Sequence, residues 1–137
     1  MLIFIFIGFH YFIMQKPRRG RGRGGGWRWA LRREGPGRPF GNLYLSEIPN
    51  AKQFRPVPMK NPQPVELTYP EYEVLRLTDL EKLKQDQVAK KMETSRGTVW
   101  RLLESAREKV TKALTESRPL IISSKGEIKK DVAQKTS

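Results

Sequence analysis

The chain has 137 residues, with 27 lysines or arginines against 14 aspartates or glutamates, and a net charge of +13. This length allows one small domain with tails, and the positive charge favours a nucleic acid or another polyanion as partner. No cysteine and one histidine, His10, are present, which excludes disulfides, cysteine-ligated metal sites and a histidine-based triad within one chain. We therefore expect no metal site and no cofactor, and a reducing cytoplasm as the location.

Residues 1–13, MLIFIFIGFHYFI, form an apolar segment. The segment is shorter than the roughly 20 residues that a helix needs to cross a bilayer, and it lacks the basic start and cleavage site of a signal peptide. Met14 then begins a basic stretch typical of the start of a soluble protein. We interpret residues 1–13 as a start-site artefact and expect no stable membrane insertion, with a weak membrane or partner contact as the alternative.

Residues 14–41 are rich in glycine and arginine and lack apolar periodicity, which predicts a flexible basic arm. Arm residues predicted to contact phosphates or the minor groove are Arg18, Arg19, Arg21, Arg23 and Arg38. Three interpretations of the arm stay open. Gly37-Arg38-Pro39 resembles the core of an AT-hook, Trp27 and Trp29 suit stacking on RNA or single-stranded bases, and a solvated tail would only raise non-specific affinity.

Residues 42–67 contain five prolines, which forbid a long helix, so we predict a partly ordered linker. Val65-Glu66-Leu67 at its end fits either a short strand or a lead-in to the first helix. Residues 123–137 are polar and are predicted to be a disordered tail.

Residues 68–122 carry a helical periodicity and are predicted to form a helix-turn-helix DNA-binding domain. Thr68 and Glu71 have the spacing of a capping box, which predicts a helix to about Leu80. The charged residues expected at the solvent face of this helix are Glu73, Arg76 and Asp79. The predicted fold class is mainly α, a three-helix domain with a long C-terminal recognition helix, flanked by a disordered basic arm and a polar tail.

The stretch from Gln85 to Leu103 has the spacing of a helix-turn-helix. A short helix over 85–92 is followed by a break at Glu93-Thr94, and Ser95 then caps a helix that runs to Leu114 or Thr115. Residues expected between the two helices are Ala89, Val99 and Leu102. This packing leaves the start of the second helix free to enter a major groove. The residues predicted to contact DNA are Ser95, Arg96, Gly97, Thr98, Trp100 and Arg101; packing of Trp100 into the core is the alternative.

Two motifs carry a resemblance to a known family. Residues 71–83 follow the pattern E-x-E-A-L-R-L-x-D-x-E-G-L, and residues 95–110 follow S-R-x-T-x-x-R-x-L-x-x-A-R-x-K-V. Gly37-Arg38-Pro39 and Phe54-Arg55-Pro56 match a basic GRP start and an F-x-P element. Over about residues 37–122 the chain is similar to the prokaryotic domain of unknown function one-three-four, whose helix-turn-helix resembles region four of sigma factors.

The chain departs from this family pattern around the first helix of the pair. Lys82 stands where glycine is usual, and Lys84 replaces a capping serine or threonine. Glu93 and Thr94 occupy the turn, where glycine or asparagine and then valine are usual. Because a lost cap costs about 1 kcal/mol, we expect the helix at Gln85 to fray at its start.

The expected function is sequence-specific DNA binding in transcription regulation. Arg96 and Arg101 can each bond guanine O6 and N7 together, and Ser95 and Thr98 can bond phosphates or base edges. The expected partners are double-stranded DNA and a second copy, in a homodimer on half-sites about 34 Å apart. We expect the dimer contact around Val110 and Leu114.

Other functions stay open. An RNA- or ribosome-associated basic protein fits the arm, and the resemblance to sigma region four implies RNA polymerase as a further candidate partner. The sequence has no nucleophile–base pair, phosphate loop or metal spacing, so we expect no enzyme. The remaining basic residues of the long helix, Arg107, Lys109 and Lys112, are assigned to a solvated face or a distant phosphate.

Overall fold

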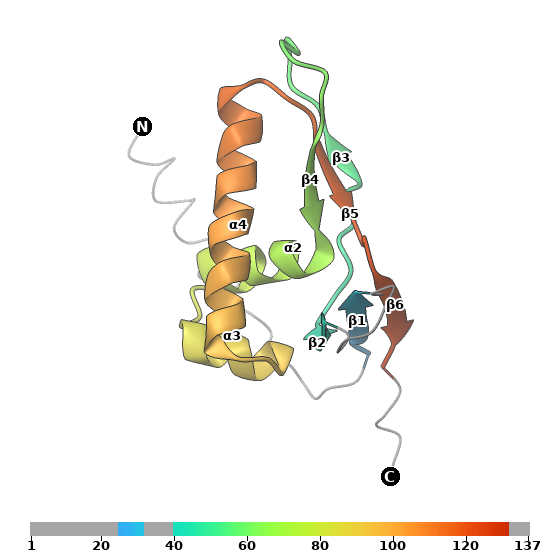
Figure 1. The fold of residues 1–137 in the computed structure, drawn as a ribbon, viewed down its shortest axis with the longest axis vertical. Helices are drawn as coiled ribbons and strands as arrows, with labels where there is room; N and C mark the ends of the chain where they lie inside the picture. The colour runs from blue at the N-terminus through green and yellow to red at the C-terminus, as the bar shows by residue number, and fades with distance from the viewer. Residues whose placement is uncertain (1–24, 32–39, 132–137) are drawn as a thin grey trace, which may run out of the picture.

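The structure, a computed structural model, describes residues 25–31 and 40–131 (Figure 1). The elements follow the order β1, β2, β3, β4, α2, η1, α3, α4, β5, β6 and build two small sheets and a group of helices. Figure 1 shows the long helix α4 upright on one side, the two sheets in succession on the other, and α2 between them. Within the described residues, no helix is both long and apolar enough to cross a membrane.

Sheet A is antiparallel with the order β2-β1-β6. Its strands are β1 (Trp27–Leu31), β2 (Phe40–Leu45) and β6 (Glu127–Lys130). Alternate side chains such as Trp29 and Leu43 point inward and are buried, as the period of two in a strand requires. At Gly26 a Cβ atom would lie 2.0 Å from the Tyr44 hydroxyl, so a larger residue at the entry into β1 would displace the Tyr44 ring.

Sheet B has the order β3-β5-β4. Its strands are β3 (Gln53–Phe54), β4 (Val65–Thr68) and β5 (Leu120–Ser123). β4 and β5 are parallel, so the whole helical group lies in the connection between them, as parallel pairing demands. β5 leads directly into β6, so one C-terminal segment contributes a strand to each sheet.

The helical elements are α2 (Tyr69–Leu75), the π-helical turn η1 (Arg76–Leu80), α3 (Gln85–Met92) and α4 (Arg96–Thr115). The predicted capping box is confirmed, because Glu71 Oε1 accepts from the Thr68 amide at 2.9 Å while Thr68 Oγ1 accepts from the Glu71 amide. The predicted ends of the first helix at Leu80 and of the helix pair also agree with the structure. The last turn of the first helix is π-helical, since the Glu81 amide donates to the Arg76 carbonyl at 3.0 Å.

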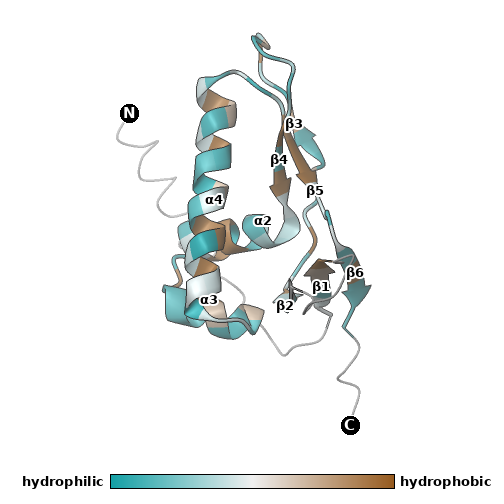
Figure 2. Cartoon of the chain, in the orientation of Figure 1, coloured by the Kyte–Doolittle hydropathy of each residue, from teal (hydrophilic) through white to brown (hydrophobic). Residues whose placement is uncertain are grey.

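The main core joins sheet A to all the helices. Its buried members are Trp29, Leu43, Leu45, Val74, Leu77, Val88, Ala89, Met92, Val99 and Leu103. A smaller cluster of Leu67, Ala106 and Ile122 packs sheet B against the middle of α4. Figure 2 shows the apolar strands β4 and β5 facing a helix whose surface is largely hydrophilic. α4 is thus anchored on one side along its length, and its other side remains exposed.

The prediction of a mainly α fold is wrong, because two three-stranded sheets accompany the helices. β1 lies in the segment predicted as a flexible arm, and β6 lies in the predicted disordered tail. The two strands pair with one another, Trp27 opposite Lys130, across nearly the whole chain. Helices form local hydrogen bonds that periodicity reveals, whereas these short strands depend on a distant partner that no local pattern shows.

The predicted solvent face of the first helix is also partly wrong. Glu73 is only 1% exposed and accepts a hydrogen bond from the Ser46 amide at 2.9 Å. Arg76 lies beside it, with Nη2 3.2 Å from Glu73 Oε2, and also pairs with Glu47 and Glu81. Sheet A and the segment after β2 cover this face, so a charge pair occupies a position that the helix alone would expose.

Candidate nucleic-acid interface

The turn between α3 and α4 is closed by local hydrogen bonds. Glu93 adopts a left-handed backbone with φ 56°, and the next amide, of Thr94, donates to the Ala89 carbonyl at 3.0 Å. Ser95 Oγ accepts from the Thr98 amide at 3.1 Å and thereby caps α4, as predicted. Val99 and Ala89 are buried between the two helices, which confirms the predicted contact. Figure 1 shows α3 crossing the lower end of α4.

The start of α3 keeps one of the two hydrogen bonds of a capping box. The Lys84 amide donates to Gln87 Oε1 at 2.9 Å, but the Lys84 side chain, unlike a serine or threonine, accepts no hydrogen bond from the first-turn amides. Asp86 follows in the first turn, where the helix dipole favours an acid. The predicted loss of the side-chain cap at Lys84 is therefore confirmed, while Gln87 and Asp86 support the helix start in other ways, and fraying stays a prediction.

Most of the predicted DNA-contacting residues lie together on the exposed surface at the start of α4. Arg96 has a 68% exposed side chain, Trp100 is 52% exposed, and Gly97 and Arg101 are exposed as well. Packing of Trp100 into the core is therefore wrong. A Cβ atom at Gly97 would have Ser95 Oγ, at 3.9 Å, as its nearest neighbour, so the fold itself does not require glycine there.

Two of the predicted contact residues, Ser95 and Thr98, already form hydrogen bonds with one another at the start of α4. Ser95 Oγ caps the helix and donates to Thr98 Oγ1 at 3.0 Å, and Thr98 is half-buried. The Val99 amide already donates to the Ser95 carbonyl. The amides of Arg96 and Gly97, in the first turn, are left without an intrahelical acceptor, as at any helix start.

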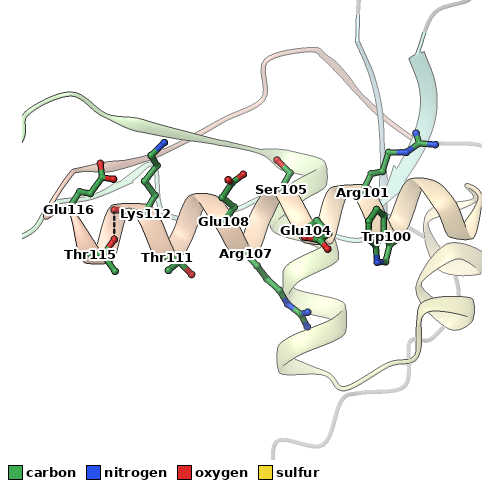
Figure 3. A pocket seen from close by; sticks show the side chains of 10 residues that line it. All are labelled: Trp100, Arg101, Glu104, Ser105, Arg107, Glu108, Thr111, Lys112, Thr115 and Glu116. Carbon is green, nitrogen blue, oxygen red and sulfur yellow. Dashed lines mark hydrogen bonds between the residues drawn. The ribbon is translucent and has the colours of Figure 1, made fainter.

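A shallow open depression whose charges alternate in sign runs along α4 from Trp100 to its end (Figure 3). It is lined by Trp100, Arg101, Glu104, Ser105, Arg107, Glu108, Thr111, Lys112, Thr115 and Glu116. In Figure 3 Arg101 and Arg107 point to opposite sides of the helix. Since three glutamates interrupt the basic residues from Glu104 onward, that part is a poor surface for a polyanion, and the cationic surface of α4 is confined to residues 96–101.

Two basic residues of the second half bind acids of the same chain. Arg107 Nη2 lies 2.7 Å from Asp79 Oδ1, and this hydrogen-bonded pair lowers the pKa of Asp79. Lys109 Nζ lies 2.9 Å from Glu71 Oε1, and Ser105 also donates to Glu71. The predicted assignment of these residues to a solvated face or a distant phosphate is therefore wrong for Lys109. Arg107 is exposed, but it shares its donors with Asp79.

Glu71 is a buried carboxylate at the junction of α2 and α4. Burial alone would raise the pKa of Glu71, but hydrogen bonds from Ser105, from the Thr68 amide and from Lys109 outweigh burial and hold this pKa below its ordinary value. The carboxylate is thus charged and fully bonded within the fold, which gives it a structural role in fixing α4 against α2.

Sequence reasoning missed the residue that connects sheet A to the helix pair. Arg28 in β1 places Nη1 2.8 Å from Glu93 Oε1 in the turn and Nε 3.3 Å from Asp131 Oδ2, with its guanidinium 5.2 Å from the Tyr44 ring centre. The hydrogen bond to Glu93 raises the pKa of Arg28. The alternation of Trp27, Arg28 and Trp29 is the sequence signal that would have predicted this strand.

The remaining predicted site residues fall in two groups. Arg18, Arg19, Arg21, Arg23 and Arg38, with the GRP tripeptide and residues 1–13, lie outside the described residues. Trp29 is buried in sheet A and its indole N–H donates to the Ser124 carbonyl at 2.6 Å, so it is not available to stack on bases. Trp27 is half-buried, with Lys130 Nζ 5.1 Å from its ring centre.

The sequence of residues 31–131 matches the family described as protein of unknown function DUF134. This chain belongs to that family. The UPF0251 protein of Pyrococcus furiosus is 45% identical over 97 residues, which cover 69% of this chain and 90% of the relative. That of Archaeoglobus fulgidus is 38% identical over 94 residues with the same coverage, and that of Thermococcus kodakarensis is 49% identical over 78 residues, covering 55% and 69%. No solved structure matches the chain.

The backbone explains two of this chain's departures from the family pattern. Lys82 and Glu93 both have a left-handed backbone, with φ 60° and φ 56°, where glycine is the least strained residue. Glu93 gains its ion pair with Arg28 in return, whereas Lys82 is exposed and has no ion pair among the described residues. Glycine at these two positions would therefore relieve backbone strain in the turns on either side of α3.

Proposed function

We propose that this protein is a sequence-specific DNA-binding protein that regulates transcription, without enzymatic activity, in the cytoplasm. The observation that carries the proposal is the exposed cationic start of α4, where Arg96 and Arg101 project beside Gly97 and Trp100. The opposite side of the helix is anchored through Val99 and the core, so this exposed start has no packing role in the described fold.

The chemistry of this surface suits a major groove. A guanidinium bonds guanine O6 and N7 together, and Trp100 offers apolar area for a thymine methyl group. The first-turn amides of α4 point toward a position where a phosphate would be favoured by the helix dipole. Gly97, whose replacement the fold would tolerate, permits close approach of the backbone to the DNA.

The basic segment before β1 would add affinity that does not depend on sequence. Because Arg28 bonds Glu93, β1 begins beside the turn, and the chain that precedes it is attached there. Arginines of this segment (Arg18, Arg19, Arg21 and Arg23), and Arg38, would then meet phosphates or the minor groove next to the site of α4. We propose a homodimer that uses the exposed Leu114 near the end of α4 and binds half-sites about 34 Å apart.

The test is selection from a random duplex pool by the full chain, in about 150 mM salt with RNA as competitor, followed by sequencing of the bound DNA. We expect an enriched, roughly symmetric motif that Arg96→Ala loses. Arg55→Ala, at an exposed arginine just after β3, is the charge-matched control and should keep the motif. Equal capture of RNA and DNA without enrichment would show a general nucleic-acid binder instead.

A further inference from the structure

Arg96 does not project freely, although it is highly exposed. Its Nε atom lies 3.4 Å from Oδ1 of Asp86, which stands in the first turn of α3, across the turn of the helix pair. Both side chains are more than two-thirds exposed, 68% for Arg96 and 71% for Asp86. An ion pair so exposed to water contributes little to the free energy of unfolding. Its effect on the orientation of the Arg96 side chain is therefore more important than its effect on stability.

The atoms in the pair decide what the arginine can still do. Asp86 approaches Nε, at the base of the guanidinium, and leaves the donors on Nη1 and Nη2 free. Bidentate bonding of guanine O6 and N7 needs two parallel donors, in a plane held at a fixed angle to the helix. A carboxylate that favours one orientation of the guanidinium before DNA arrives reduces the rotamer freedom lost on binding.

Arg101 provides the contrast within the same helix. It is exposed at the start of α4, yet among the described residues it has no ion pair that would fix its direction. It can therefore turn toward a phosphate or a base without preference. Of these two exposed arginines, only Arg96 has an acidic partner among the described residues.

We propose that Asp86 is a positioning residue that orients Arg96 for one guanine, so that each half-site contains a guanine whose recognition depends on both residues. This inference rests on the proposed DNA-binding function and adds to it the identity of one base and the residue that enforces it. Asp86 acts through Arg96 and does not itself contact the base.

The experiment measures binding of the full chain to the selected duplex and to three duplexes with the Arg96-dependent base replaced. The variants are Asp86→Ala, Asp86→Asn and, as matched control, Asp79→Ala, which removes the acidic partner of another exposed arginine of α4, Arg107, at 2.7 Å. We expect the unaltered chain to prefer guanine roughly 5- to 150-fold. Asp86→Ala should bring that preference close to the level of Arg96→Ala, and Asp86→Asn should give a smaller loss.

A purely electrostatic or structural role of Asp86 would give a different result. Removing a negative charge near DNA should by itself strengthen binding to all four duplexes alike, and loss of a helix-start acid should only lower thermal stability. Discrimination retained in Asp86→Ala, equal loss in Asp79→Ala, or an Arg96-dependent base other than guanine would each overturn the inference while leaving DNA binding intact. Failure of the unaltered chain to select any motif would overturn the proposed function, and the inference with it.

Discussion

The two halves of α4 use their charged side chains in opposite ways. In the second half, Lys109 binds Glu71 and Arg107 binds Asp79, so these cations are neutralised by acids of the same chain. In the first half, Arg96 and Arg101 keep donors directed at solvent. One helix thus serves as a structural element at one end and offers a binding surface at the other.

This difference shows that a count of basic residues does not locate a nucleic-acid interface. The chain carries a net charge of +13, yet much of the charge on its folded part is used in internal pairs such as Arg76 with Glu73 and Arg28 with Glu93. Only cations without a buried or well-bonded acidic partner can exchange counterions for phosphates. The internal pairs should therefore govern stability, and the exposed arginines should govern binding.

The largest effect is expected from Glu73→Ala. The substitution would leave Arg76 largely buried beside fewer acids and the Ser46 amide without its acceptor, so we expect a loss of about 3 kcal/mol in the free energy of unfolding. Urea unfolding followed by tryptophan fluorescence measures it. Glu104→Ala, at an exposed position of α4, should change the same quantity by no more than about 0.5 kcal/mol. Similar effects of both variants would show that the Glu73 pair does not support the fold.

The comparison of the two halves is tested directly by Arg101→Ala and Arg107→Ala. Removal of Arg101 should weaken binding to the selected duplex by about 1 to 3 kcal/mol and leave stability unchanged within error. Removal of Arg107, which pairs with Asp79, should leave DNA affinity nearly unchanged and lower stability by no more than about 1 kcal/mol. Fluorescence anisotropy at fixed salt and thermal melts supply the two measurements. If Arg107→Ala weakened binding as much as Arg101→Ala, the interface would extend along the whole helix.

The helices could be predicted from the sequence, and the short strand β4 was one of two interpretations of Val65-Glu66-Leu67, but sheet A could not be predicted, for a physical reason. Ser95, Thr68 and the apolar period of α4 encode helix starts and faces within a few residues. Sheet A instead depends on Trp27 meeting Lys130, a pairing that exists only after the chain has folded. The strand pattern in β1 was present, but its glycine- and arginine-rich surroundings outweighed it.

The residues of the candidate site also fall into those that the sequence predicts and those that it does not. The exposed start of α4 follows from helix periodicity, so Arg96, Gly97 and Arg101 could be named from the sequence. Arg28 could not, because its role arises from a strand that returns to the turn at Glu93. The burial of Glu73 was likewise hidden, since the covering segment after β2 is remote in sequence.

Lowering the pH is expected to have a smaller effect on the free energy of unfolding. The pKa of Glu71 in the folded protein lies below its ordinary value of 4.5. The hydrogen bonds to the Glu71 carboxylate therefore stabilise the fold fully above about pH 4.5, and this stabilisation is lost as the pH falls through the folded-state pKa. The free energy of unfolding should therefore decrease as the pH is lowered below about 4.5. Ser105→Ala removes one of the hydrogen bonds that lower this pKa and should make the decrease shallower. An unchanged slope in that variant, measured by urea unfolding at each pH, would assign the acid sensitivity to other carboxylates.

The smallest effect is expected from two residues with a left-handed backbone. Glu93 forms an ion pair, and Lys82 forms none among the described residues. Lys82→Gly relieves backbone strain at an exposed residue without an ion pair among the described residues, so it should stabilise the fold by about 1 kcal/mol. Glu93→Gly relieves the same strain but removes the carboxylate that Arg28 binds at 2.8 Å, so the two changes should nearly cancel. Thermal melts of both variants, with Arg28→Ala as background, measure this. On that background Glu93→Gly should become stabilising, because the ion pair is already absent; if it does not, the Arg28 contact contributes nothing to holding the turn.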